Sequence, residues 1–340
     1  MKILVIKPSS LGDVIHALPF LNALKETFPD SQVDWVISRN IKDIIQDIPL
    51  INSLIVLDKD SWKRIRNIPK TLAEISKLRK ALKAKHYDIV VDLQGLLRSG
   101  LISLSAPSTM KIGFADAREG SRFCYDRKIR VDKNIHAVDK CLAAAEVLGA
   151  KTNRVKFPLC IDSAAKKTVI KLLGGIKGYI VVAPSARWAT KRWPARNFAK
   201  LISNTATPCV ITGTKRDNSI AVKILDNLSD RKTKSAKTIN LCGKTGLKEL
   251  TALIAGAKAV VTNDSGPMHI AAALNKPVIA VFGPTDPEKT GPYGWEDSDK
   301  MSVIRAGVPC SPCRKRTCDD LVCMNNVSVR SVSEVLKKHS

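Results

Sequence analysis

Residues 260–269, Val-Val-Thr-Asn-Asp-Ser-Gly-Pro-Met-His, decide how this chain folds. They predict a buried strand, a sharp polar turn and the start of a helix that continues through residues 270–274. A strand that enters a helix through Asp264, Ser265 and Gly266 directs free backbone N–H groups and the positive helix end toward one point. Such a point is a seat for an anion, above all a diphosphate.

A second polar turn is predicted at the same edge of the sheet. The strand at residues 277–282 ends in residues 283–287, Gly-Pro-Thr-Asp-Pro. In open α/β sheets, ligands bind at the carboxyl ends of the strands. The C-terminal half is therefore predicted to hold a nucleotide or another phosphorylated ligand.

Strand and helix patterns alternate along the whole chain, which predicts an α/β protein with parallel sheets. The chain has 340 residues, more than a single core usually holds, and residues 172–178 are rich in glycine. We therefore predict two Rossmann-like domains, 1–174 and 175–340, facing a central cleft, with a last helix at about 331–338 that is a candidate for packing back on the first domain. The expected strands are 2–7, 32–37, 53–57, 89–92, 179–183, 209–213, 239–241, 259–262 and 278–282, and helices are expected at 71–85 and 138–148.

The charge of the chain is strongly positive, with 56 Lys and Arg against 31 Asp and Glu and a net charge of +25. This excess favours an anionic partner: nucleic acid, an anionic membrane surface or a phosphorylated substrate, although a generally basic proteome would produce it too. The sequence contains no apolar run long enough to span a membrane and no signal-peptide pattern at its start. We therefore expect a cytoplasmic protein.

The loop after the first strand, residues 7–16, reads Lys-Pro-Ser-Ser-Leu-Gly-Asp-Val-Ile-His. It is neither a dinucleotide-binding glycine fingerprint nor a phosphate-binding Walker loop. Asp13 stands at the start of the next helix, where a carboxylate can cap the helix by accepting backbone N–H bonds. The same position also suits a general base, and one carboxylate can fill both roles.

Four segments in order resemble the bacterial lipopolysaccharide heptosyltransferases, glycosyltransferase family nine. They are residues 1–19, the Asp-Leu-Gln-Gly segment at 92–95, the Lys-Arg-Trp-Pro segment at 191–194 followed by Phe198, and residues 263–269 together with 282–287. The resemblance implies the GT-B architecture and inverting transfer of heptose from ADP-heptose to the Kdo/heptose inner core, with Asp13 as the general base. It implies no cofactor and no metal.

The resemblance also implies which residues bind the donor. Lys191 would contact the donor phosphates, although a lysine beside Arg187 and Arg192 could equally be a solvated surface cation. Ser265 and Gly266 would offer backbone N–H groups to the diphosphate, and Asp264 would bind or orient donor hydroxyls. His269 would meet the phosphates unless it is packed in the core. Ser10 and Gly12 would line the sugar end of the cleft.

The acceptor implied by the resemblance is an anionic lipid A–Kdo core at the cytoplasmic face of the inner membrane, which makes the enzyme peripheral there. A basic stretch between residues 59 and 85 suits such an acceptor, although each cation could also belong to a solvated face. The candidate acceptor contacts are Lys63, Arg64, Arg66, Arg98, Arg118 and Arg127.

Nine cysteines are present, and five of them, Cys124, Cys141, Cys160, Cys209 and Cys242, stand in apolar contexts typical of buried thiols. The other four, Cys310, Cys313, Cys318 and Cys323, match structural zinc by number but not by regular spacing. Reduced thiols in a packed loop or one disulfide explain them as well.

Three other functions remain open. The chain could be a family-nine transferase with another nucleotide sugar or acceptor, or a catalytically silent binder of sugar nucleotides. The net charge also permits a nucleic-acid-binding protein, but only 5% of residues are aromatic and the usual nucleic-acid-binding motifs are missing. We therefore expect no nucleic-acid partner.

Overall fold

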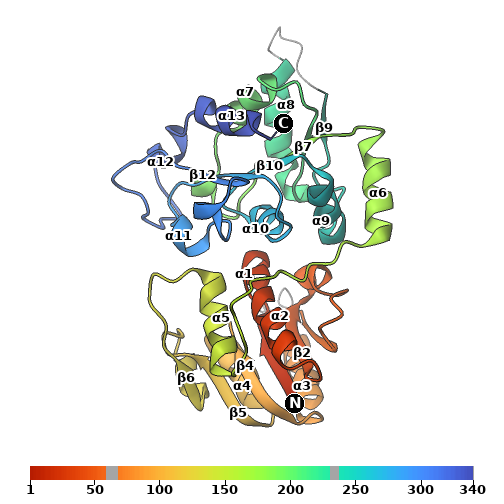
Figure 1. Ribbon diagram of the computed structural model, residues 1–340, viewed down its shortest axis with the longest axis vertical. Coiled ribbons are helices and arrows are strands. Elements are labelled where there is room, and N and C mark those ends of the chain that lie inside the picture. Colours follow the sequence, from red (N-terminus) through yellow and green to blue (C-terminus); the bar gives the residue numbers. More distant parts are fainter. Residues whose placement is uncertain (59–67, 230–236, 340) are drawn as a thin grey trace. The chain divides into compact units, whose positions relative to one another are not determined.

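The computed structural model describes residues 1–58, 68–229 and 237–339, with the side chains of helix α3 described from residue 76 onward. The chain divides into two compact units, Met1–Cys160 and Ile161–Ser340 (Figure 1). Each unit contains one six-stranded parallel sheet with helices packed on it.

The first unit has its strands in the order β3-β2-β1-β4-β5-β6. The strands are β1 (Lys2–Ile6), β2 (Gln32–Ser38), β3 (Ser53–Leu57), β4 (Tyr87–Asp92), β5 (Ser108–Phe114) and β6 (Arg127–Ile129). The helices are α1 (Leu11–His16), α2 (Leu18–Thr27), α3 (Ile68–Lys83), α4 (Leu97–Ser105) and α5 (Ala137–Val147), with short 3-10 turns η1 (Arg39–Ile44) and η4 (Ser121–Cys124).

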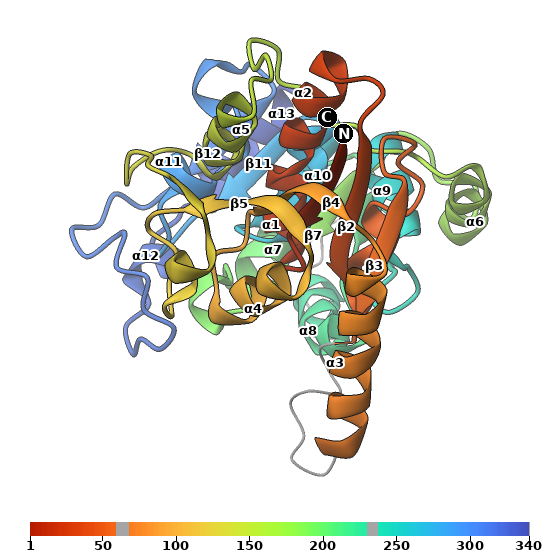
Figure 2. The same ribbon diagram turned by 90° about the horizontal axis from the view of Figure 1, so that it is seen from below.

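Both faces of this first sheet are covered, which explains why β1 is apolar along almost its whole length. On one face, Leu82 of α3 and Ile102 of α4 pack against Leu4, Ile6 and Val90. Helices α2 and α5 contact each other, and Figure 2 shows them on the opposite side of the sheet from α3 and α4.

The second unit has its strands in the order β12-β11-β10-β7-β8-β9. They are β7 (Ile180–Ala183), β8 (Cys209–Ile211), β9 (Thr238–Asn240), β10 (Ala259–Asn263), β11 (Val278–Val281) and β12 (Met301–Ile304). The helices are α6 (Ser163–Leu173), α7 (Ala195–Ser203), α8 (Asn218–Ser229), α9 (Leu247–Gly256), α10 (Gly266–Ala273), α11 (Pro287–Thr290), α12 (Val322–Asn325) and α13 (Val329–Lys337), with 3-10 turns η5 (Ala189–Lys191), η6 (Lys215–Asp217) and η7 (Trp295–Asp297).

The two sheets share one topology. Numbered within its own unit, each sheet has the strand order 3-2-1-4-5-6, in which the direction of winding reverses between the first and fourth strands. That reversal lies between β1 and β4 in the first unit and between β7 and β10 in the second. Ligands of doubly wound sheets bind at the carboxyl ends of the strands at such a switch point, so each unit has one place where a site is expected.

The division between the units falls before α6, not after it as the sequence predicted. Helix α6 packs on α9 and belongs to the second unit. The last helix, α13, was a candidate for packing back on the first domain. It buries Val332 and Leu336 in the core cluster of the second unit that also contains Trp193, and it belongs to that unit. No helix in the described part of the chain is long and apolar enough to cross a membrane.

Candidate functional site

In the first unit, Asp13 is held by the start of α1. Ser10 is the N-cap of this helix, and its backbone N–H and side-chain hydroxyl both donate to Asp13 Oδ2, each at 2.7 Å. Asp13 is therefore the third helical residue of a capping box and not the N-cap that the sequence suggested. This arrangement fixes the carboxylate immediately beyond the end of β1.

Asp92, the last residue of β4, organises the neighbouring loop. Its Oδ1 accepts from the N–H groups of Gln94 at 2.8 Å and Gly95 at 3.1 Å, and its Oδ2 accepts from the Tyr125 hydroxyl at 2.7 Å. Burial raises the pKa of Asp92 above its usual value, while these hydrogen bonds act in the opposite direction. Gly95 has a φ of +65°, which favours glycine, and its carbonyl accepts from the Arg118 N–H at 2.9 Å.

The two loops enclose a pocket of about 230 Å³ that includes Asp13 and Arg118 in its lining. Two lysines that the sequence analysis did not single out line it as well. Lys7 is almost fully buried and donates to the Leu93 carbonyl at 2.7 Å. Lys140 makes an ion pair with Asp116 at 2.6 Å. Two carboxylates, Asp13 and the Lys140-paired Asp116, thus line the pocket together with three cations. Such a pocket can bind an anionic molecule, and a carboxylate in it can accept a proton from that molecule.

Other residues predicted for this end of the site lie elsewhere. Among the described residues, Ser10 and Gly12 are outside the pocket lining, and Ser10 acts on Asp13 instead. Arg127 is exposed on β6 and donates to the Val147 carbonyl at 3.4 Å. Arg98 is exposed on α4. Lys63, Arg64 and Arg66 lie outside the described residues.

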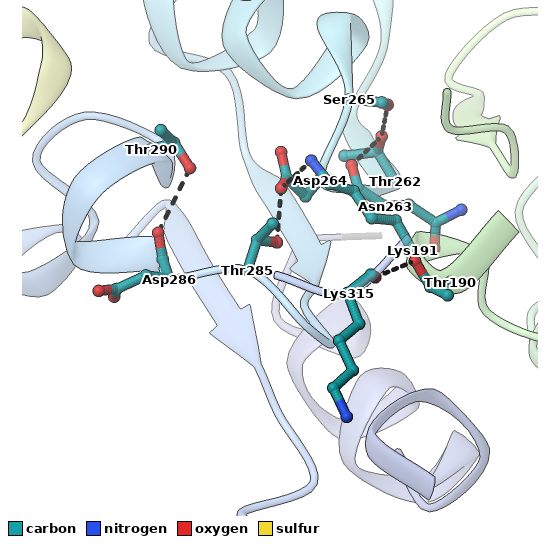
Figure 3. A network of polar contacts seen from close by, with 10 residues as sticks. All are labelled: Thr190, Lys191, Thr262, Asn263, Asp264, Ser265, Thr285, Asp286, Thr290 and Lys315. Carbon is teal, nitrogen blue, oxygen red and sulfur yellow. Dashed lines mark hydrogen bonds and ion pairs between the residues drawn. The ribbon is translucent and has the colours of Figure 1, made fainter. Parts of the chain in front are cut away.

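In the second unit, Lys191 and Asp264 form an ion pair at the switch point (Figure 3). The Lys191 ammonium lies 2.6 Å from Asp264 Oδ2, and the Thr285 hydroxyl donates to the same oxygen at 2.6 Å. The side chains of Lys191 and Asp264 are only 17% and 7% exposed. Lys191 is therefore not a solvated surface cation, and Asp264 is held by both Lys191 and Thr285.

Asn263, the last residue of β10, ties this site to the strand beside it. Its Oδ1 accepts from the Trp193 N–H at 3.1 Å, and its Nδ2 donates to the Pro184 carbonyl at 2.7 Å. Trp193 is 2% exposed and packs edge-on against Phe198, with its indole N–H bonded to the Val327 carbonyl. The loop that carries Lys191 is thus anchored on both sides.

A second cation stands beside Lys191. The Lys191 ammonium lies 4.7 Å from the centre of the Trp188 ring, and the Arg316 guanidinium lies 4.8 Å from the same centre. The segment that carries Arg316 is pinned here because the Thr190 hydroxyl donates to the Lys315 carbonyl at 2.9 Å (Figure 3). Sequence reasoning missed Arg316, whose place depends on a contact between distant parts of the chain.

Helix α10 begins at Gly266 with Ser265 as its N-cap, as the sequence predicted. The Ser265 hydroxyl lies 3.1 Å from that of Thr262. His269 is 7% exposed and lies in the same helix. The start of α10 thus directs backbone N–H groups toward the end of β10, where an anion can bind.

The cysteines are free thiols throughout the described residues. Cys310, Cys313 and Cys318 are exposed and Cys323 is buried, and no group of three or more His, Cys, Asp or Glu side chains in the described ranges is arranged to hold a metal ion. Of the five cysteines predicted to be buried, Cys141, Cys209 and Cys242 are buried, Cys124 is half-buried and Cys160 is exposed.

Two doubly wound units in one chain match the GT-B architecture seen in heptosyltransferase structures. The structure of E. coli heptosyltransferase WaaC with ADP matches with a TM-score of 0.77 and 25% identity, covering 100% of both chains. The family model of glycosyltransferase family 9 (heptosyltransferase) matches residues 75–322. The chain belongs to this family and is a transferase.

Similar proteins align over most of their length. Lipopolysaccharide heptosyltransferase 1 of Pseudomonas aeruginosa is 30% identical over 334 residues, covering 94% of this chain and 87% of the relative. The lipopolysaccharide core heptosyltransferase OpsX of Haemophilus influenzae is 28% identical over 301 residues, covering 86% and 82%.

Proposed function

We propose that this protein transfers heptose from ADP-heptose to the Kdo/heptose inner core of lipopolysaccharide, with inversion at the anomeric carbon. The names of its relatives support the sugar and the acceptor. A matching E. coli structure holds ADP-2-deoxy-2-fluoro heptose, which supports the donor. In this proposal the enzyme works in the cytoplasm, at the inner face of the inner membrane.

The main support for acceptor binding in the first unit is the position of Asp13 in a pocket that is also lined by Lys7, Arg118 and Lys140. A phosphorylated and carboxylated acceptor is polyanionic, so cations would hold it in this pocket. Asp13 would then remove the proton from the attacking hydroxyl as the new glycosidic bond forms. The bonds from Ser10 keep the carboxylate in one orientation for this step.

The donor half of the proposal rests on the second unit. In an inverting displacement the bond between the sugar and ADP breaks as the new bond forms, and negative charge develops on the leaving diphosphate. Lys191, paired with Asp264, and Arg316, which contacts the same Trp188 ring as Lys191, would stabilise that charge together with the N–H groups at the start of α10. We propose that these groups replace a metal ion, so that the reaction needs no metal.

A direct test incubates the purified protein with ADP-heptose and Kdo–lipid A, with and without EDTA. UDP- and GDP-sugars serve as competing donors. We expect transfer only from ADP-heptose, and we expect EDTA to leave its rate unchanged. The anomeric configuration of the product, measured by NMR, should be opposite to that of the donor. Transfer from another nucleotide sugar would keep the reaction class and reject heptose, and retention of configuration would reject Asp13 as a simple base.

A further inference from the structure

An apolar patch lies on the outer face of helix α4. Leu97, Leu101 and Leu104 are 46%, 54% and 55% exposed, and their spacing places them on one side of the helix. Phe123, 73% exposed, belongs to the turn η4, which packs beside α4. Four of the nine large apolar side chains that are exposed in the described residues are therefore gathered here.

This patch is not needed for the fold of the unit. Helix α4 buries its opposite side, including Ile102, in the core below the sheet. A helix with one face in the core and a second row of leucines facing solvent exposes more apolar surface than folding explains. Contiguous exposed apolar surface of this kind marks an interaction site.

Several cations lie on the elements that carry the patch and on the neighbouring helix. The Arg122 guanidinium lies 4.8 Å from the centre of the Phe123 ring, and Arg98 is exposed on α4 itself. On the neighbouring helix α3, Arg79 donates to the hydroxyl of Ser105 at the end of α4. Figure 2 shows these two helices on the same side of the first sheet. Lys77, Lys80 and Lys83 of α3 are exposed as well.

One carboxylate beside the patch, that of Glu119, is bonded to the helix: its Oε2 accepts from the Leu97 backbone N–H at 3.1 Å, at the start of α4. Apolar side chains with cations beside them match the surface of a bilayer that contains anionic lipids, where the apolar groups enter the interface and the cations meet the headgroups. A second copy of this chain would bring the same cations against one another, at a net charge of +25 per chain.

The patch is also linked along the chain to the pocket of the first unit. Helix α4 starts directly after the loop that contains Gln94 and Gly95, which line the pocket. Arg118, another lining residue, precedes the turn that carries Phe123. The same two loops therefore connect the pocket with the apolar patch.

We propose that the outer face of α4, with Phe123, docks this protein on an anionic membrane surface. Docking there places the pocket beside the lipid headgroups, where a membrane-anchored acceptor presents its sugars. The presentation of a membrane-anchored acceptor to the pocket rests on the proposed function. The docking itself depends only on the patch and its cations.

Vesicle flotation tests the inference without any substrate. Wild-type protein is mixed with vesicles of phosphatidylethanolamine and phosphatidylglycerol, or with vesicles of phosphatidylcholine alone. We expect binding to the anionic vesicles only, weakened by salt. The double variant Leu101→Gln with Leu104→Gln should lower the partition coefficient about tenfold, because two leucines no longer enter the interface. The double variant Arg98→Gln with Arg122→Gln should remove much of the salt-sensitive part of vesicle binding.

The matched control is Ile170→Gln, which changes an apolar side chain of similar exposure, 67%, on α6 of the second unit. It should leave vesicle binding unchanged. Circular dichroism melting and calorimetry with ADP establish that each variant is folded and binds nucleotide. Wild-type binding to vesicles without heptose transfer would uphold the docking surface and reject the proposed function.

Three results would overturn the inference. The first is failure of the wild-type protein to float with anionic vesicles, and the second is flotation of the leucine double variant equal to that of the wild type. The third is a dimer in sedimentation velocity that the leucine variant dissociates while vesicle binding persists, which would assign the patch to contact between copies.

Discussion

The two units of this protein have the same strand order but different chemistry at equivalent positions. The fourth strand of the first unit ends in Asp92, whereas the fourth strand of the second unit ends in Asn263. Both side chains anchor a loop at the switch point. The buried carboxyl of Asp92 accepts from local N–H groups and from Tyr125. The neutral Asn263 instead bonds to both ends of the loop that carries Lys191, at Pro184 and at Trp193.

The ionisable groups differ in the same way. In the second unit the cation Lys191 is paired with Asp264. In the first unit the buried ammonium of Lys7 bonds to the Leu93 carbonyl, and Asp13 takes its hydrogen bonds from Ser10. One topology thus supports an arrangement suited to stabilising a leaving phosphate and another suited to accepting a proton. Substitutions in the first unit should therefore affect the chemical step, whereas substitutions in the second should affect donor binding.

The largest effect is expected at Asp13. Asp13→Asn keeps the shape of the side chain but removes its basicity, and we expect kcat to fall by roughly 10²–10⁴. Donor affinity, measured by calorimetry with ADP, should remain unchanged. Ser10→Ala is the matched control, because it removes one bond to Asp13 and should lower kcat far less. Turnover near that of the wild type in Asp13→Asn would remove the base from the first unit.

Lys191→Met should have the next largest effect, and this effect should fall on the affinity for ADP. A lost charge-assisted bond to the diphosphate costs about 1.5–3 kcal/mol, equivalent to a roughly ten- to hundredfold higher Kd for ADP. Lys315→Met is the control, since Lys315 contributes its carbonyl here and Figure 3 shows its side chain directed away from Lys191. Equal affinity in the two variants would contradict the donor assignment.

The contrast between Asp92 and Asn263 predicts a pH effect on stability. Because burial raises the pKa of Asp92, the folded protein retains a proton that the unfolded chain loses above about pH 3.9. The stability linked to this carboxyl is therefore complete below that pH and falls as the pH rises through the raised pKa.

Asp92→Asn is neutral across the whole range. The difference in unfolding free energy between this variant and the wild type should therefore move in favour of the variant as the pH increases. Urea unfolding at a series of pH values measures it. A difference that stays constant with pH would show that Asp92 titrates normally in the folded protein.

The smallest effect is expected at Arg316. Its interaction with the Trp188 ring and a nearby phosphate is worth about 0.5–1 kcal/mol, so Arg316→Gln should weaken ADP binding about two- to fivefold. Arg330→Gln, which breaks an exposed pair with Glu334 on α13, serves as the control and should leave ADP binding unchanged. Equal effects of the two changes would mean that Arg316 acts only through net charge.

Much of this architecture can be predicted from the sequence because the central strands are continuous apolar runs. β1, β7 and β10 were predicted to within a residue or two for this reason. β5 was not predicted, since Lys111 and Gly113 interrupt its apolar pattern, and Gly113 leaves room for the Tyr125 ring that bonds Asp92. β6 and β12 were not predicted either.

The residues of the candidate site also differ in how well the sequence predicts them. Asp13, Lys191 and Asp264 stand in local motifs that resemble a family, so they could be singled out in advance. Lys7, Lys140 and Arg316 reach their sites through contacts between distant segments, which no local pattern records. For Lys7 one signal was present: a lysine that directly follows a buried strand at a switch point.

The central claim is that the first unit activates the acceptor and the second binds the donor. The most direct measurement determines the Kd for ADP-heptose and the single-turnover rate at saturating donor, side by side, for wild type, Asp13→Asn and Lys191→Met. We expect a crossed pattern. Asp13→Asn should lower the single-turnover rate and keep the affinity for ADP-heptose, whereas Lys191→Met should chiefly lower that affinity. Loss of donor affinity in Asp13→Asn, with wild-type affinity in Lys191→Met, would contradict it.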